Sequence, residues 1–173
     1  MPSAAIRTFK GTPVIPDELV NKAYVDASGG GGAGLTFAKV VKAADETVNN
    51  SNTFQDDDVL KWAALANKVY MYYMILFMNS PATADLKYTF TIPTGAVGDT
   101  ISGSWSPIGE TIAQGITTSS VVSTDGINEV IVTSGRVITG GTAGDCQLQW
   151  AQQIAQALDT KILQGSSIIT WES

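Results

Sequence analysis

A run of glycines near the N-terminus divides this chain into two parts of very different size. Residues 28–34 read Ser-Gly-Gly-Gly-Gly-Ala-Gly, and a segment of this composition joins its neighbours as a flexible linker. Residues 1–34 are too few to enclose a hydrophobic core of their own, whereas residues 35–173 have the size of one domain. We therefore predict an N-terminal arm with a linker at 1–34 and a folded body at 35–173.

Composition and charge exclude several classes of protein. Apolar residues make up 44% of the chain and charged residues 15%, which excludes a disordered chain. The net charge of −6 argues against nucleic acid as a partner, because phosphate binding needs clustered Lys and Arg. Residues 1–16 carry Arg7 and Lys10 and no acid, whereas residues 35–173 hold 7 basic and 13 acidic side chains. We therefore expect a basic arm tip and an acidic body.

The N-terminus and the cysteine content indicate where the chain folds. Residues 1–10 lack the apolar run of a signal peptide, and no apolar segment is long enough to span a membrane as a helix. The single cysteine, Cys146, has no partner for an intrachain disulfide. We expect folding in a cytoplasm, with no contact to a membrane.

The body has the pattern of an all-β protein. Its apolar segments are short and rich in Val, Ile, Thr and aromatic residues, and clusters of Gly, Asn, Asp and Pro separate them. The sequence predicts strands near 35–43, 46–49, 53–55, 59–66, 68–78, 86–92, 99–106, 110–114, 118–123, 127–139, 145–154, 158–163 and 166–172. The Gln and Ala content of 147–158 would also suit a helix, but Leu148 and Trp150 alternate with glutamines and favour a strand. Short strands at this spacing predict a jelly-roll-like antiparallel β-sandwich, preceded by an extended arm with a short helix.

The segment 69–78 is apolar on both faces of a strand. It contains ten apolar or aromatic residues and no charge. A sandwich strand normally exposes one face to water. We expect the outer face to be covered by a neighbouring segment of the chain or by another subunit.

The search for catalytic chemistry finds no site. The chain contains no histidine, which excludes His-based triads and His–metal sites. Cys146 has no activating histidine, so we expect a small packed residue. Asp56–Asp58 lack the spacing of an EF-hand, and an acidic surface turn is the more ordinary role. Gly29–Gly34 are not a phosphate loop, because no Lys-Ser or Lys-Thr follows them.

Two further kinds of site stay open on sequence grounds. A glycosidase needs only a pair of carboxylates, and nothing singles out two among 16 acids. A sugar-binding platform could use the tryptophans, although core packing is their ordinary role. The tryptophans are Trp62, Trp105, Trp150 and Trp171. We expect no enzyme activity, no cofactor and no bound metal.

Three segments resemble bacteriophage structural proteins. Residues 20–26, Val-Asn-Lys-Ala-Tyr-Val-Asp, are similar to the segment N-K-A-Y-V-D that recurs in phage tail-fibre and other trimeric virion proteins. Residues 42–95 and 140–171 resemble a phage structural-protein family in the order of their motifs. These motifs are, in order, a first segment D-E-x-V-x-N-S, an acidic run D-D-D, an apolar strand that ends in Phe, and a late strand with the family sequence L-Q-L-Q-W-A-Q. The resemblance implies a β-sandwich domain of a virion protein. Two parts of the chain do not match the family pattern: the middle segment, 99–139, and the N-terminal arm.

The resemblance and the absence of fibre repeats lead to a function. The chain has no heptads and no shaft-like repeat, which a tail fibre needs to project its tip. We expect a homotrimeric, non-enzymatic capsid decoration (cement) protein, made in the host cytoplasm, located in the virion and bound to the major capsid protein or another virion protein. One alternative is a tail or tail-fibre component that contacts a host receptor. A carbohydrate-binding module is a second alternative, from a different class.

The arm and one strand supply the predicted contact residues. Two prolines and alternating apolar and polar residues predict that residues 4–16 are extended and add as a strand to a partner. The predicted capsid contacts are Ile6, Arg7, Phe9, Lys10, Val14 and Ile15. A helical face and the apolar strand predict the trimer contacts Leu19, Val20, Ala23, Tyr24, Val25, Tyr70 and Tyr72.

Overall fold

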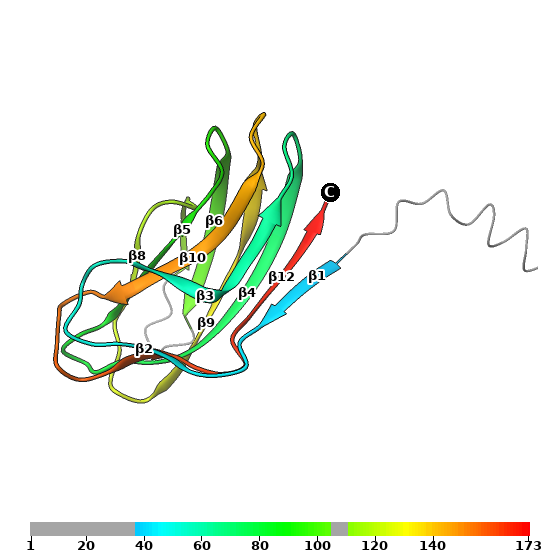
Figure 1. Cartoon of the computed structure of the whole chain (residues 1–173). Helices are drawn as coiled ribbons and strands as arrows, with labels where there is room; N and C mark the ends of the chain where they lie inside the picture. Colours follow the sequence, from blue (N-terminus) through cyan, green and yellow to red (C-terminus); the bar gives the residue numbers. More distant parts are fainter. Residues whose placement is uncertain (1–36, 105–110) are drawn as a thin grey trace, which may run out of the picture. The chain divides into compact units, whose positions relative to one another are not determined.

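The computed structural model of the protein describes residues 37–104 and 111–173, all of which belong to one compact unit, Thr36–Ser173. Within these residues the chain forms twelve strands and no helix, and the strands make two antiparallel sheets (Figure 1). The predicted all-β sandwich is therefore confirmed. The predicted arm, its short helix and the boundary at residue 34 lie outside the described residues.

The larger sheet contains eight strands and the smaller sheet four. The strands of the larger sheet are β1 (Phe37–Val41), β2 (Glu46–Val48), β4 (Val69–Asn79), β6 (Val97–Ser104), β7 (Thr111–Gly115), β9 (Asn128–Ile138), β11 (Thr160–Ile162) and β12 (Ser167–Glu172). Those of the smaller sheet are β3 (Gln55–Ala64), β5 (Leu86–Thr91), β8 (Ser120–Val122) and β10 (Gly144–Gln152). The main orders are β1-β12-β4-β9-β6-β7 and β3-β10-β5-β8, and β11 joins β4 to β2.

Ten of the strands pair from the two ends of the chain inward. β1 pairs with β12, β2 with β11, β3 with β10, β4 with β9, and β5 with β8. The chain thus forms an antiparallel ribbon, and from the pair β2–β11 inward successive strand pairs alternate between the two sheets. This wrapping is that of a jelly roll, as the sequence predicts. The hairpin β6–β7 is inserted between β5 and β8 and extends the larger sheet beyond β9.

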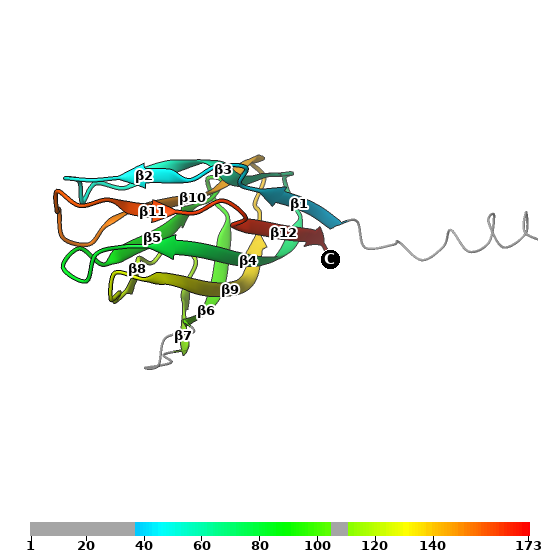
Figure 2. The ribbon, with the colours of Figure 1, turned by 90° about the horizontal axis from the view of Figure 1, so that it is seen from below.

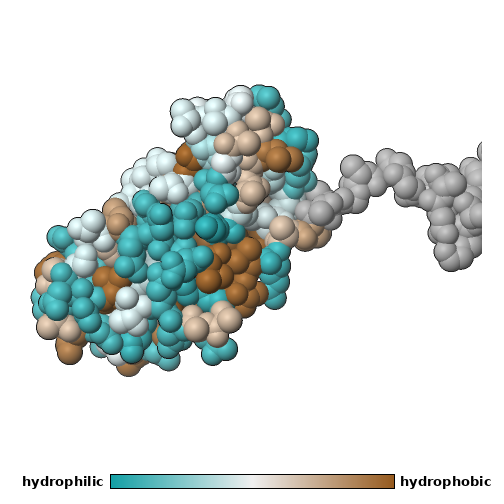
Figure 3. All heavy atoms as spheres, in the orientation of Figure 1, coloured by the Kyte–Doolittle hydropathy of each residue, from teal (hydrophilic) through white to brown (hydrophobic). Residues whose placement is uncertain are grey.

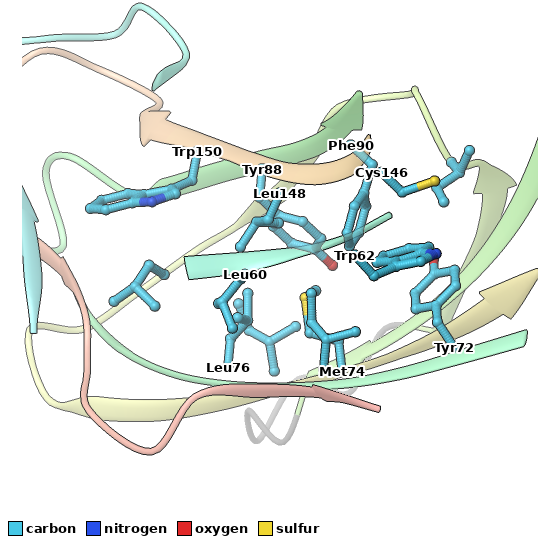
Figure 4. Packing of buried hydrophobic residues seen from close by; sticks show 14 of the residues in the cluster. Leu60, Trp62, Tyr72, Met74, Leu76, Tyr88, Phe90, Cys146, Leu148 and Trp150 are labelled. Carbon is cyan, nitrogen blue, oxygen red and sulfur yellow. The ribbon is translucent and has the colours of Figure 1, made fainter. Parts of the chain in front are cut away.

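The core lies between the sheets and is densely aromatic. Alternation along β4 turns five side chains inward, where each is at most 8% exposed. Figure 4 shows three of them, Tyr72, Met74 and Leu76, facing the inward side chains of β10. The rings of Trp62, Tyr72 and Phe90 pack together with centroids 5.4 to 6.0 Å apart. The five inward side chains of β4 are Tyr70, Tyr72, Met74, Leu76 and Met78.

The acidic triplet lies in a strand, which corrects one prediction. The strands predicted at 53–55 and 59–66 form a single strand, β3, and the surface turn predicted at Asp56–Asp58 is wrong. Asp57 is fully buried, and its carboxylate accepts a hydrogen bond from Lys42 Nζ at 2.8 Å. A buried carboxylate requires such a partner. β3 carries the three acids with an irregularity: its register with β10 shifts between Asp56 and Lys61, where Asp57 accepts hydrogen bonds from the backbone of Val59 and Leu60.

The ambiguous segment 147–158 begins as a strand. β10 continues to Gln152, which confirms the strand, and the residues that follow form a loop. The side chain of Gln152 is fully buried at this transition. Its Oε1 accepts the backbone N–H of Gln156 at 2.9 Å and its Nε2 donates to the carbonyl of Leu158 at 2.8 Å. The amide thus holds the loop against the end of β10.

Cys146 is a packed core residue, as predicted. Its side chain is fully buried on β10. Burial raises the pKa of the thiol from 9.0 to about 12, and the charge of Asp145 adds to the shift. Since only the thiolate is reactive, the native cysteine is inert at neutral pH.

The stability of the body is expected to fall as the pH rises above 9.0, the ordinary pKa of a thiol. The folded-state pKa of Cys146 lies above the unfolded value, so its contribution is complete below this pH and is lost toward pH 12. Each pH unit in this window lowers the free energy of unfolding by up to about 1.4 kcal/mol. Urea unfolding between about pH 8 and 10 should show a shallower decline for Cys146→Ala than for the native protein. Equal declines would contradict this assignment.

Candidate interaction surface

The outer face of the larger sheet is apolar. The odd-numbered residues of β4 point away from the core, and Tyr73 and Phe77 are 38% and 37% exposed. Figure 2 looks onto this side, where β12, β4 and β9 lie side by side. The outer side of a sandwich sheet usually carries polar residues, and a contiguous exposed apolar patch marks a contact surface. This face is therefore the candidate functional site.

Neighbouring strands extend the surface in register with β4. Met71 lies opposite Trp171 of β12, and Ile75 lies opposite Val132 of β9. Antiparallel partners in register share a face of the sheet, so these side chains form continuous rows. We call the whole set the outer apolar face. It consists of Phe37, Val69, Met71, Tyr73, Ile75, Phe77, Val97, Ile101, Val130, Val132, Ile138, Ile169 and Trp171.

Few charges interrupt the outer apolar face. Among the side chains that the structure describes, the register places Lys39, Asp99 and Arg136 in its rows. Arg136 and Asp99 form an ion pair at 3.0 Å and neutralise each other. Residues 35–173 carry 13 acids in all, so most of the negative charge lies elsewhere. Another acidic protein can approach this face with little repulsion.

The sheet edge next to this face is open. Among the described strands β1 pairs only with β12, and Phe37 and Val41 are 60% and 44% exposed. The rings of Phe37 and Trp171 are in contact, with centroids 5.7 Å apart. Figure 3 shows hydrophobic side chains gathered over the end of β1. An edge strand presents unpaired N–H and C=O groups to a further strand, so β1 can accept one.

A buried ion cluster supports this edge from inside. Lys42 follows β1, is 2% exposed, and bonds to Asp57 at 2.8 Å and to Glu46 at 2.5 Å. Burial lowers the pKa of Lys42, but the hydrogen bonds to both carboxylates outweigh it and hold the pKa above 10.5. Asp57 also accepts the backbone N–H groups of Val59 and Leu60, at 2.9 and 2.7 Å. The cluster ties the larger sheet to β3 and is structural.

The structure changes the predicted trimer contacts. Tyr70 and Tyr72 are 8% and 1% exposed and belong to the core, so the prediction that they contact another subunit is wrong. Their hydroxyl groups are used internally: that of Tyr72 donates to Thr100 at 2.7 Å, and that of Tyr70 accepts from the backbone of Leu65 at 3.0 Å. The outward positions of the same strand are Tyr73 and its odd-numbered neighbours. The alternation was visible in the sequence, but it did not say which set faces inward.

The other predicted contact residues belong to the N-terminal arm. The arm residues and the helical set lie outside the described residues. They are Ile6, Arg7, Phe9, Lys10, Val14, Ile15, Leu19, Val20, Ala23, Tyr24 and Val25. Sequence reasoning missed the contributions of β6, β9 and β12 to the outer apolar face. Their short alternating runs give no sign of which strands are neighbours.

The tryptophans do not form a sugar-binding platform together. Trp62 and Trp150 are 6% and 0% exposed and pack in the core, as predicted. Trp171 lies in the outer apolar face, and Trp105 lies outside the described residues. An open pocket of about 550 Å³ lies at another place. It is lined by Asn79, Pro81, Gly126, Ala157, Leu158 and Asp159, none of them aromatic.

The described residues contain no cluster of metal-binding side chains. In residues 37–104 and 111–173 no three His, Cys, Asp or Glu side chains gather where they could hold a metal ion. Asp57, the central acid of the triplet, is held by Lys42. No helix in the described part of the chain is long and apolar enough to cross a membrane. The outer apolar face therefore stays the candidate functional site of the described residues.

Comparison with known proteins places the chain in no family. No family model and no curated protein matches it. A solved structure of the tripod from the baseplate of bacteriophage Tuc2009 is similar with a TM-score of 0.33 and 10% identity, over 99% of this chain and 78% of that one. The VP2 subviral particle of infectious bursal disease virus is similar with a TM-score of 0.25 and 8% identity, over 81% of this chain and 40% of that one. Both are components of virus particles.

Proposed function

We propose that this protein is a non-enzymatic capsid decoration (cement) protein of a phage, a homotrimer that binds the shell through its N-terminal arm. The observation that carries the proposal is the outer apolar face, a charge-poor surface on a folded body that is otherwise acidic. Such a surface binds protein. The chain enters the body at Phe37, at the edge of this face. The resemblance of residues 20–26 to trimeric virion proteins supports the same reading.

The arm is the proposed attachment to the shell. Its apolar residues have too few neighbours in residues 1–34 to make a core, so they are available to a partner. They are Ile6, Phe9, Val14 and Ile15, and the basic residues among them are Arg7 and Lys10. A basic arm suits an acidic patch on the shell, while the acidic body keeps particles apart in solution. Strand addition would supply the backbone hydrogen bonds of the contact.

Stabilisation of the shell follows from mass action. A protein that binds the assembled shell and not its separated subunits stabilises it by about 2.7 kcal/mol per site at a hundredfold excess over Kd. Three arms on one trimer raise the effective concentration of each arm, so weak individual contacts add up to durable attachment. The proposed trimer segment, Leu19 to Val25, lies directly after the arm. One trimer can therefore bind the shell at three places.

A tail or tail-fibre component is the alternative function, and particles from which the protein has been removed separate the two. For a decoration protein, stripped particles are expected to burst at lower temperature than native ones and to adsorb to host cells at the normal rate. Adding the purified protein back should restore the bursting temperature. Measuring the bursting temperature and the adsorption rate on one preparation of stripped particles decides between the two functions. Normal shell stability with lost adsorption would overturn the proposal in favour of the tail.

A further inference from the structure

We propose that the occupant of the outer apolar face is the same face of the other copies in the trimer, so that the bodies as well as the arms pack around the axis. This inference rests on the proposed function, since it assumes the trimer. It names the body surface that the trimer uses. Three observations carry it: the chain length before Phe37, the charge of the face, and its size.

The chain length before the body brings the faces together. Eleven residues, 26–36, separate the proposed trimer segment from Phe37. A Gly-rich chain of this length spans roughly 17–20 Å on average. Phe37 is itself a member of the outer apolar face, at 60% exposure. Three chains that meet at residues 19–25 therefore hold three such faces close to one axis.

The charge distribution selects this face for contact between identical copies. Each copy carries a net charge of −6, so two copies repel each other over most orientations. Among the described side chains in the rows of the outer apolar face the one acid, Asp99, is paired with Arg136 at 3.0 Å, and Lys39 adds a positive charge. Like-charge repulsion is therefore weakest there. Aromatic residues, Met and Arg, which are the types enriched in protein interfaces, are present in the same rows.

The size of the face explains why the contact needs the trimer segment. From β1 to β6 there are four strand spacings, and from Val69 to Phe77 eight residue steps. At about 4.8 Å per strand and 3.3 Å per residue this is roughly 500 Å². Stable complexes of free proteins bury about 800 Å² per partner. A tethered contact needs less, because the linker supplies a local concentration in the millimolar range.

Cysteine labelling of the full-length protein tests the inference. Ile101→Cys places a thiol in the outer apolar face, and Val121→Cys places one on β8 of the other sheet as a matched control. The native residues are 52% and 44% exposed. Native Cys146 is fully buried, and its pKa is raised to about 12, so it does not contribute to maleimide labelling. In the trimer we expect the face thiol to react about tenfold or more slowly than the control, as for a tethered contact open a tenth of the time or less.

The same probes in a monomer complete the test. In a Leu19→Asp, Tyr24→Asp background, which removes the trimer segment, the two thiols are expected to react at similar rates. Equal rates in an intact trimer would overturn the inference and leave the proposed function standing. Protection only on phage particles would assign the face to the shell, and protection that persists in the monomer would assign it to the chain's own arm; both overturn it. If light scattering shows that the native protein is monomeric, the homotrimer of the proposed function fails as well.

Discussion

Replacing Asp57 by alanine is expected to lower the free energy of unfolding of the body by about 3–5 kcal/mol. The change leaves Lys42, which is 2% exposed, with Glu46 as its remaining partner. It also removes the acceptor of the backbone N–H groups of Val59 and Leu60. The loss has two sources: the buried Lys42 keeps only one of its two carboxylate partners, and two backbone N–H groups lose their acceptor.

Asp58→Ala is the matched control for this change. Asp58 is the next residue on β3 and its side chain is exposed, so its loss should alter stability by no more than about 0.5 kcal/mol. Urea denaturation followed by tryptophan fluorescence measures both variants. Equal stability of the two alanine variants would refute the role given to the buried cluster.

Deleting residues 1–18 is expected to abolish attachment to phage particles while the body stays folded. The deletion spares Leu19 and the proposed trimer segment, so the trimer should persist. Losing all three arms removes the multivalent advantage, which is typically worth a factor of about 10² to 10⁴ in affinity, together with the contacts themselves. Sedimentation of labelled protein with stripped particles measures attachment.

Two full-length variants show which part of the arm binds. Changing Ile6 and Phe9 to serine removes apolar contacts, and changing Arg7 and Lys10 to glutamine removes charge. The serine variant should bind weakly at any salt concentration, whereas the glutamine variant should lose mainly the salt-dependent part of binding. Undiminished sedimentation of the truncated protein would show that the body alone attaches to the shell.

The strands and the jelly roll could be predicted because their determinants are local. Turn residues mark the strand ends: Gly126 and Gly95 adopt φ values of +89° and +79°, which favour glycine. Alternation within each segment gave the two faces of β4. The burial of Asp57 could not be predicted, since its partner Lys42 is 15 residues away and precedes two strands. Nothing local distinguishes a buried acid from the two exposed acids beside it.

The candidate surface could be predicted only in part. The sequence indicated that the outer face of the strand 69–78 would be covered by a neighbouring segment or by another subunit. The structure identifies that face as the one with Tyr73 and Phe77. The inward set is decided by packing against Trp62 and Phe90, which come from other strands. The rest of the surface depends on strand order, because β9 and β12 flank β4 only after the ribbon has wrapped.

The pairing of first strands with last also sets the order in which the body can be made. β1 can pair with β12 only after Ser167–Glu172 have been synthesised. In the same way, β3 can pair only after β10 has been synthesised. Contacts this distant in sequence must close large loops before they contribute, so they form late and slowly. Until β12 is in place, β1 and β4 expose backbone edges that can pair with any other chain. A copy whose β12 has not yet been synthesised can therefore pair wrongly with another chain.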